Sequence, residues 1–371
     1  MRTRTVRRAV VSLAALGLAA TVAACGSSST SNGTSSASSA SGASGTNYDG
    51  MSAADLASAA NTEGQVNWYT TFASTDVQPI VAAFNKVYPK IKVNPLRLSA
   101  SQLPPKIITE QRGHQYTADV VSGDSPQLAQ LIQAKALQPY TSPEETSLPA
   151  GLSLPTGYKT VVYAVTTALA WNPTIVKQKG LPVPTSIETF TEPAWKGKFS
   201  IDPTAVNWYD SLIKIMGHQQ ALALVQKLGN NNPVLVESHT QALTDVQAGE
   251  PAGAVTAYGY KASSLEKKTP TEVAFLNTSP LPSSLNLIDV VLNAPHPAAA
   301  RLFVDWMVSQ AGQTAVVAQT NHTSLRSDVT NDAKVWDPTK WTPTWGNPTL
   351  PSATYNSELA ELGQALHAPS Q

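Results

Sequence analysis

The sequence contains one cysteine in 371 residues, which leaves no partner for a disulfide within the chain. Charged residues are also scarce, at 13% of the chain, and basic and acidic residues balance at 25 each. Because there is no basic excess, we expect no nucleic-acid partner. The six histidines show no metal-binding spacing such as H-E-x-x-H, and we interpret them as surface residues. An apolar fraction of 42% and 27 prolines fit a compact secreted protein with many fixed turns.

Residues 1–24 have the pattern of an export signal. Four arginines precede an apolar run over residues 9–24 that carries no charge. The run is shorter than the roughly 20 residues that a membrane-spanning helix needs, and it ends in small residues rather than in a basic cluster. We therefore predict a signal peptide, with a spanning helix as the alternative. Its removal leaves a chain with four more acidic than basic residues.

The stretch "VAAC", which ends at Cys25, resembles the lipobox of bacterial lipoproteins. This resemblance implies that the Cys25 sulfur takes a diacylglyceryl group and that Cys25 becomes the mature N-terminus. The residues that follow are mostly Ser, Gly, Ala and Thr, which bury too little surface to offset the entropy of ordering. We expect residues 25–62 to tether a lipid-anchored protein to the extracellular face of the cell membrane, or to the periplasmic side where an outer membrane exists.

Beyond the tether, short apolar runs alternate with helical patterns. Residues 65–71 alternate with a period of two, and four apolar residues then recur at helical spacing, Val77, Ile80, Val81 and Phe84. Repeated units of this kind predict α/β lobes with mainly parallel sheets. The roughly 310 residues after the tether exceed the size of a usual single core, so we expect two lobes. Ligands of such sheets bind beyond the carboxyl ends of the strands, in the strand-to-helix loops.

Three segments, in order, resemble extracellular solute-binding proteins of ABC importers. They are residues 171–201, which include "EPAWKGKFSI", residues 245–265 ("DVQAGEPAGAVTAYGYKASSL") and residues 293–313 ("NAPHPAAARLFVDWMVSQAGQ"). The resemblance is to the branch that includes ferric-iron binders and binders of small anions and organic phosphonates. It implies an α/β, two-lobed periplasmic-binding-protein-like fold of type II, with the ligand in a cleft between the lobes and no catalysis.

From this resemblance we place lobe 1 at residues 63–160 plus 281–325 and lobe 2 at residues 161–280 plus 326–371, joined by crossing strands. The expected function is that of a lipid-anchored receptor that captures a small solute and delivers it to an ABC permease. We expect a monomer that is not an enzyme and needs no cofactor, with ferric ion possible only as the transported ligand.

The first strand-to-helix loops offer candidate ligand-binding residues. Thr71, Ser74 and Thr75 lie where a helix begins, and free backbone N–H groups at such a point suit an anion. The alternative is that Thr75 only caps the helix. Asp124 and Ser125 follow the next such strand, at a position where iron-binding relatives often carry a carboxylate ligand. The alternative there is an acid that stabilises the helix dipole.

Candidates from the other lobe are Asn207 and Ser238, both in strand-to-helix loops. Ser238 with Gln241 also has the pattern of a capping box, so a purely structural role is an equal alternative. Four residues of the chain, "SLEK" from Ser264 to Lys267, match the serine-lysine pattern of penicillin-recognising acyl transferases. The companion S-D-N and K-T-G motifs are absent. An anchored serine acyl transferase or hydrolase is therefore a remote alternative, as is an adhesion or signalling module on the same fold.

Tyr258 and Tyr260 bear on the identity of the solute. In ferric-iron binders of the family, an adjacent tyrosine pair at this point supplies two phenolate ligands. Here Gly259 separates the pair, and in an extended strand residues two apart face the same side. The alternative is two half-buried strand aromatics. Because the pair is broken and Ala73 stands where iron-binding relatives can carry histidine, we expect a small organic anion such as a phosphonate or phosphate ester. Ferric ion bound by Asp124, Tyr258 and Tyr260 is the alternative.

Overall fold

The computed structural model describes residues 48–146, 148, 152–337 and 339–369. The predicted signal peptide, Cys25 and most of the predicted disordered tether therefore lie outside the described residues. The end of the predicted tether is wrong, because Ala53–Glu63 form a helix that buries Leu56 and Ala60 in an apolar core. The described residues belong to one compact unit. No helix in this part of the chain is both long and apolar enough to cross a membrane.

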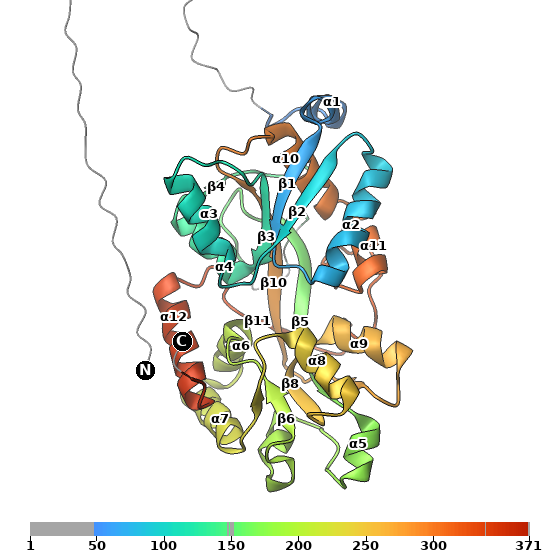
Figure 1. The fold of residues 1–371 in the computed structure, drawn as a ribbon, viewed down its shortest axis with the longest axis vertical. Coiled ribbons are helices and arrows are strands. Elements are labelled where there is room, and N and C mark those ends of the chain that lie inside the picture. Colours follow the sequence, from blue (N-terminus) through green and yellow to red (C-terminus); the bar gives the residue numbers. More distant parts are fainter. Residues whose placement is uncertain (1–47, 147, 149–151, 338, 370–371) are drawn as a thin grey trace, which may run out of the picture. The chain divides into compact units, whose positions relative to one another are not determined.

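The strands form one mixed sheet with the order β2-β1-β3-β10-β5-β8-β6-β7, and β4, β9 and β11 pair beside this path (Figure 1). The strands are β1 (Gln65–Thr70), β2 (Lys92–Arg97), β3 (Val120–Asp124), β4 (Leu137–Gln138), β5 (Val161–Trp171), β6 (Phe199–Ile201), β7 (Val234–Leu235), β8 (Gly253–Tyr258), β9 (Ala274–Leu276), β10 (Leu281–Val291) and β11 (Pro343–Trp345).

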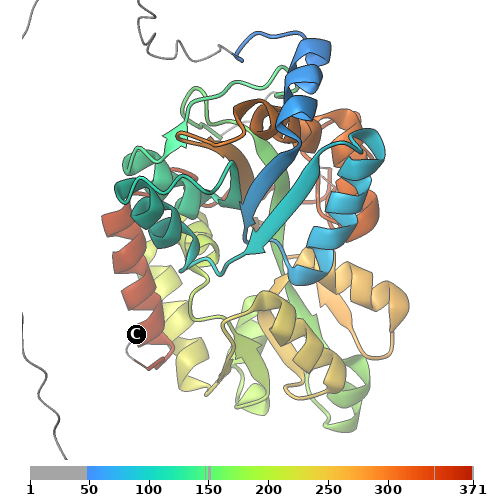
Figure 2. The ribbon, with the colours of Figure 1, turned by 45° about the horizontal axis from the view of Figure 1, so that its top comes forward.

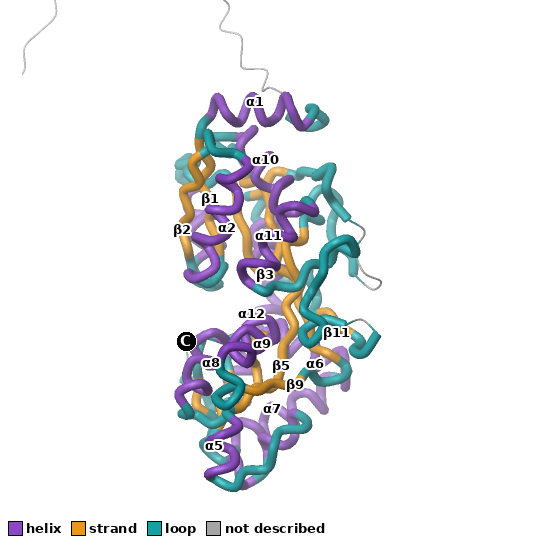
Figure 3. The backbone as a smooth tube through the Cα atoms, turned by 90° about the vertical axis from the view of Figure 1, so that its right-hand side faces the viewer, coloured by secondary structure: helices purple, strands orange, loops and turns teal. Residues whose placement is uncertain are grey.

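Strand direction corrects the expectation of mainly parallel sheets. At each end of the path the strands are parallel, β1 with β2 and β3, and β6 with β7 and β8. In the middle, β5 and β10 run antiparallel to each other, and each is antiparallel to its outer neighbour. The reason is topological, because β5 carries the chain from one half of the sheet to the other and β10 brings it back (Figure 3).

Helices cover both halves of the sheet (Figure 1). They are α1 (Ala53–Glu63), α2 (Ser74–Val87), α3 (Leu103–Arg112), α4 (Ser125–Gln133), α5 (Pro173–Gln178), α6 (Val206–Met216), α7 (His218–Asn230), α8 (His239–Ala248), α9 (Gly259–Lys268), α10 (Pro297–Val308), α11 (Gln310–Thr320) and α12 (Ser352–Ala365), with short 3₁₀ turns η1 (Ile187–Thr191) and η2 (Pro193–Trp195).

Separate apolar clusters form the cores of two lobes. In the first lobe, the ring of Trp68 of β1 packs edge-on against the ring of Phe72, with 5.4 Å between the ring centroids. It also packs, tilted, against Phe303 of α10, with 5.3 Å between the centroids. In the second lobe, the ring centroid of Phe190 lies 4.7 Å from that of Trp195 and 5.4 Å from that of Phe199 of β6. Burial of one aromatic side chain contributes about 2–3 kcal/mol to the free energy of folding. Each cluster therefore stabilises its own half of the sheet.

The helical spacing that begins at Val77 is confirmed, because α2 buries its apolar residues against the first-lobe core.

The C-terminal helix α12 contacts both lobes. Leu362 and Leu366, the residue after the helix, belong to the second-lobe core, and the first half of α12 also packs on α4 of the first lobe (Figure 2). There Ser352 Oγ lies 2.9 Å from Gln133 Oε1.

Candidate functional site

Strand-to-helix junctions from both lobes bring polar and aromatic side chains together where β5 and β10 pass between the lobes. We call this group the seam cluster. Its members are Asp76, Asp124, Tyr163, Asp202, His239, Tyr258, Tyr260, Lys261, Asn286 and His322. The contacts described next show that these residues meet.

Two aspartates of the first lobe lie at helix starts. Asp76, in the first turn of α2, is only 4% exposed, and its Oδ1 accepts a hydrogen bond of 2.9 Å from Thr75 Oγ1. Asp124 is the N-cap residue of α4, and its Oδ1 accepts a hydrogen bond of 3.2 Å from Asn286 Nδ2. Burial raises the pKa of both carboxyl groups, against the opposing effects of Lys261 on Asp76 and of Asn286 on Asp124. Both carboxylates are therefore held in surroundings poor in water.

The second lobe contributes an aspartate and a histidine. Asp202, just before α6, accepts a hydrogen bond of 2.8 Å from the Thr204 backbone N–H. His239 begins α8, with Nδ1 at 2.5 Å from the Thr256 carbonyl and Nε2 at 3.5 Å from Asp202 Oδ2. Because a carbonyl oxygen only accepts, Nδ1 carries a proton. Nε2 therefore donates to Asp202 only when the ring is charged.

Five rings form a continuous stack through the seam cluster. Tyr163 of β5 lies 3.8 Å from His322, measured between ring centroids, and His322 lies 4.0 Å from Tyr260. The stack continues from Tyr260 to Tyr258 at 5.7 Å and from Tyr258 to His239 at 4.1 Å. Pairs of aromatic rings contribute about 0.5–1.5 kcal/mol beyond their burial. The stack therefore links the first-lobe core to the start of α8.

His322 overturns part of our interpretation of the histidines. Its ring is 1% exposed between Tyr163 and Tyr260, and burial lowers its pKa well below the usual range, so the ring is neutral. The interpretation as a surface residue is wrong because α11 is followed by its C-cap residue Asn321, whose left-handed conformation (φ 61°) turns the chain back into the protein. His239 and His296 are also only partly exposed.

The two tyrosines do not lie on one extended strand, and that geometric expectation is wrong. Tyr258 ends β8 and is the N-cap residue of α9, whereas Tyr260 is already helical. The rings still meet because the chain turns at Gly259, where an added Cβ would lie 2.5 Å from Thr166 Oγ1. Burial raises the pKa of both phenols well above 10, and nearby carboxylates act in the same direction, Asp124 first for Tyr258 and Asp76 first for Tyr260.

The predicted first-lobe residues fall into two groups. Thr75 lies at the cluster, 3.4 Å from Lys261 Nζ, and Ser125 is buried beside Asp124. Thr71 donates its backbone N–H to the Ser122 carbonyl at 3.1 Å. Ser74 is exposed at the start of α2.

The predicted second-lobe residues are held by local structure. Ser238 caps α8 by accepting a hydrogen bond of 3.2 Å from the Gln241 backbone N–H, which is the structural alternative that we weighed for it. Asn207 lies in the first turn of α6, and its carbonyl accepts a hydrogen bond of 2.8 Å from Ser211.

Several members of the cluster were missed by the sequence reasoning. Asp202 and His239 lie in the two loops that we singled out, His239 next to the residue chosen there, so the loop pattern could have found them. Tyr163, Asn286 and His322 come from long strands and a helix end, where no local pattern marks them. Tyr355 of α12 lies near Asp124 and Asp202, where burial and then the charges of these two residues raise the pKa of its phenol to about 12.

The cluster holds more carboxyl groups than ammonium groups. Asp76, Asp124 and Asp202 face the ammonium group of Lys261, and burial raises the pKa of Asp76 and Asp124, which disfavours their charged forms. Two like unit charges about 5 Å apart repel by about 3 kcal/mol at an effective dielectric constant of 20. A helix N-terminus attracts an anion by about 2 kcal/mol at most. The carboxylates therefore dominate over the helix ends in setting which charge the cluster accepts.

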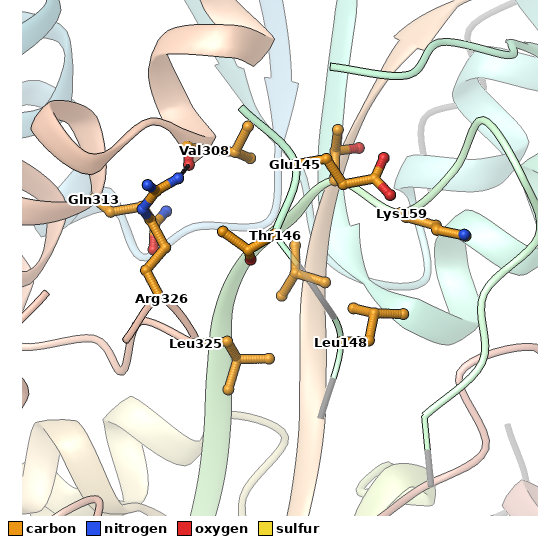
Figure 4. A pocket seen from close by; sticks show the side chains of 10 residues that line it. Glu145, Thr146, Leu148, Lys159, Val308, Gln313, Leu325 and Arg326 are labelled. Atoms are coloured by element: carbon orange, nitrogen blue, oxygen red, sulfur yellow. Dashed lines mark hydrogen bonds between the residues drawn. The ribbon is translucent and has the colours of Figure 1, made fainter. Parts of the chain in front are cut away.

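No group of three or more His, Cys, Asp or Glu side chains suited to a metal ion occurs in the described part of the chain. Two hollows lie apart from the seam cluster. One, of about 10 Å³, has room for about one water molecule and is lined by Glu145, Lys159, Gln313 and Arg326 among others (Figure 4). The other, of about 280 Å³, lies between α3, the end of α4 and the end of β10, and Arg112 and Tyr116 line it.

The family model for bacterial extracellular solute-binding proteins matches residues 41–314. The chain belongs to this family. Its fold is the two-lobed type II fold of periplasmic binding proteins, and proteins of this kind serve ABC importers. No curated protein shows significant sequence similarity to this solute-binding protein.

Solved structures share the fold of this solute-binding protein. AfuA from Actinobacillus pleuropneumoniae, with bound fructose-6-phosphate, is 19% identical, with a TM-score of 0.72 over 82% of this chain and 99% of AfuA. Iron-bound HitA from Pseudomonas aeruginosa is 23% identical, with a TM-score of 0.61 over 82% and 97%. An ABC transporter substrate-binding protein from Agrobacterium tumefaciens is 14% identical, with a TM-score of 0.68 over 81% and 94%.

The acyl-transferase alternative gains no support from this solute-binding protein's geometry. Lys267 Nζ is engaged by the Asp332 carboxylate in an ion pair of 2.7 Å. Ser263, the neighbour of Ser264, also donates to Asp332. The family is one of receptors, and these residues tie α9 to the segment that follows α11.

Proposed function

We propose that this solute-binding protein is a lipid-anchored receptor that captures a small solute at the seam cluster and delivers it to an ABC permease. The observation that carries the proposal is that side chains of both lobes meet there. Asp76 and Asp124 come from the first lobe, and Tyr258, Tyr260 and Lys261 come from the second. A solute held between them binds the closed form better than the open form, and this difference drives closure.

Lys261 is a direct polar link between the lobes, beside the hydrogen bond of 3.0 Å that Asn321 Nδ2 donates to the Tyr260 carbonyl. Its Nζ, from α9, lies 3.4 Å from Thr75 Oγ1 and 3.8 Å from Asp76 Oδ1 at the start of α2. The two long strands β5 and β10 connect the lobes beside it and provide the hinge. Opening therefore separates Lys261 from α2 and exposes the carboxylates.

Thermal unfolding with a panel of small solutes tests the site. A solute present at ten times its Kd stabilises the native state by about 1.4 kcal/mol. We expect this gain to disappear in the double variant Asp124→Ala, Tyr260→Ala and to persist in the double variant Arg112→Ala, Tyr116→Ala, which alters the 280 Å³ hollow instead. The reverse pattern would place the solute in that hollow and contradict the proposal.

Ferric ion is a second candidate, favoured by three tyrosines of the cluster, Tyr163, Tyr258 and Tyr260, beside Asp124. Phenolate and carboxylate oxygens suit this hard cation, and HitA is an iron-bound protein of the same fold. Ferric citrate added to the metal-free protein should then give a visible charge-transfer colour that Tyr258→Phe or Tyr260→Phe removes. A colourless mixture excludes this candidate.

A small organic anion, our expectation from sequence, draws support from helix starts. Among the described residues, no side-chain hydrogen bond caps α2, α4, α6 or α9, which leaves backbone N–H groups free. AfuA, of the same fold, holds a sugar phosphate. The carboxylates at three of these helix starts oppose an anion, so any anionic group needs a compensating positive one.

The anchor yields a separate prediction. Cys25→Ala removes the sulfur that would carry the lipid, so the protein should appear in the medium or keep its signal peptide. Fractionation of cells and an immunoblot of the membrane fraction measure this. A processed Cys25→Ala protein that stays with the membrane would show that another feature holds it there.

A further inference from the structure

Three buried polar atoms at the seam have no hydrogen-bond partner among the described residues. They are Asp76 Oδ2, Asn286 Oδ1 and Thr166 Oγ1. Their side chains are 4%, 0% and 1% exposed, so bulk water does not solvate them. The first two atoms are pure acceptors, and the third can accept. Buried polar atoms are normally paired, so these positions call for a ligand that donates hydrogen bonds.

The positions of these atoms tie them to the cluster. Asn286 donates its Nδ2 to Asp124, so its free Oδ1 belongs to an amide that lies against that carboxylate. Thr166 Oγ1 lies 2.5 Å from where a Cβ on Gly259 would sit, between the two tyrosines. Asp76 Oδ2 is on the carboxylate that faces Lys261.

The protein's own ammonium group does not satisfy these acceptors. Lys261 Nζ stays 3.8 Å from Asp76 Oδ1, whereas a charge-assisted hydrogen bond of this kind spans about 2.7–2.9 Å. Burial raises the pKa of Asp76 and Asp124, which disfavours their charged forms. An ammonium group beside these carboxyl groups would stabilise the charged forms, so the site suits a cation.

We propose that the solute bears a primary or secondary ammonium group, which the seam cluster recognises through the carboxylates of Asp76 and Asp124 and the free acceptors of Asn286 and Thr166. The inference rests on the proposed function, since it names the chemical class of solute for that same site. The ammonium N–H groups donate to the free acceptors, and the charge offsets the carboxylates. An acidic group elsewhere on the solute is tolerated, because free N–H groups of the helix starts lie close by.

Three matched probes distinguish recognition of the ammonium group from recognition of the acidic group. They are 2-aminoethanol with the amine alone, ethylphosphonate with the acid alone, and 2-aminoethylphosphonate with both. Isothermal titration of the full chain should show that 2-aminoethylphosphonate binds at least tenfold more tightly than ethylphosphonate, and that 2-aminoethanol binds measurably. Asp76→Asn should weaken the aminated probes at least tenfold and leave ethylphosphonate unchanged. Asp124→Asn serves if Asp76→Asn does not fold, and the double variant Arg112→Ala, Tyr116→Ala is the control that should bind as the native chain does.

The other outcomes overturn the inference in distinguishable ways. If ethylphosphonate binds as tightly as 2-aminoethylphosphonate, the ammonium group is irrelevant and the receptor proposal stands with an anionic solute. If only ferric citrate binds, with colour, the receptor proposal stands with a metal ion. If none of these probes binds, the inference is wrong, and the receptor proposal is then decided by the thermal panel alone.

Discussion

Replacing Asp289 with asparagine should raise the free energy of unfolding at pH 8 by about 2 kcal/mol and should lower it at pH 4 by about 1.5 kcal/mol. Asp289 of β10 is 3% exposed, and its Oδ1 accepts a hydrogen bond of 3.1 Å from Thr160. Its Oδ2 has no partner among the described residues. Burial raises the pKa of this carboxyl to about 7.

The sign follows from where the proton is held. Below about pH 3.9 the carboxyl is protonated in both the folded and unfolded states, and it makes no difference to stability. Between that pH and about 7 the unfolded chain ionises first, so folding becomes progressively less favourable. The full penalty for a shift of about three units is about 4 kcal/mol at pH 8. Asparagine avoids it but leaves its amide N–H group unpaired, which costs about 1–3 kcal/mol.

Urea unfolding of both proteins at pH 4 and pH 8 measures the difference. Glu188→Gln is the control, because Glu188 is exposed on η1 and its substitution also removes one negative charge. Equal stabilities of Asp289→Asn and the native protein at pH 8 would show that water or a proton donor already satisfies the buried carboxylate.

The sequence predicts the scaffold of the site better than the site itself. The helical spacing from Val77 to Phe84 correctly predicts α2, because that signal is local. The start of a helix beside Asp124 is also predicted, although its N-cap is Asp124 rather than the expected Ser125. The expectation that Gly259 continues the strand is wrong, since β8 ends at Tyr258 and only the close approach of Thr166 reveals the bend.

Long-range packing decides the rest of the cluster. Asn286 reaches Asp124 because β10 pairs with β3, and Tyr163 reaches His322 because residue 323 bridges to Ala164 of β5. These pairings join segments more than 150 residues apart. Periodicity within a window of a dozen residues carries no information about them. The family resemblance supplies the type of fold, which in turn explains why such segments meet between two lobes.

Replacing His322 with alanine should open the unliganded protein. The His322 ring lies between Tyr163 of the first lobe and Tyr260 of the second, at 3.8 and 4.0 Å. His322 follows α11 of the first lobe, so its contact with Tyr260 is the one that crosses between the lobes. One such contact contributes about 0.5–1.5 kcal/mol, which corresponds to a shift of roughly 2-fold to 13-fold toward the open form. His322→Phe keeps a ring at this place and should keep the lobes closed.

Spin labels can report the opening because the chain offers no competing thiol once Cys25 is replaced by alanine. Val87 of α2 and Val183 of the second lobe are 54% and 56% exposed, so Val87→Cys and Val183→Cys place one label on each lobe. The distance distribution should broaden and lengthen in His322→Ala and stay unchanged in the control His114→Ala, whose ring is exposed. If His322→Ala keeps the native distribution, the stack does not hold the lobes together, and Lys261 with Asp76 becomes the contact to test for that role.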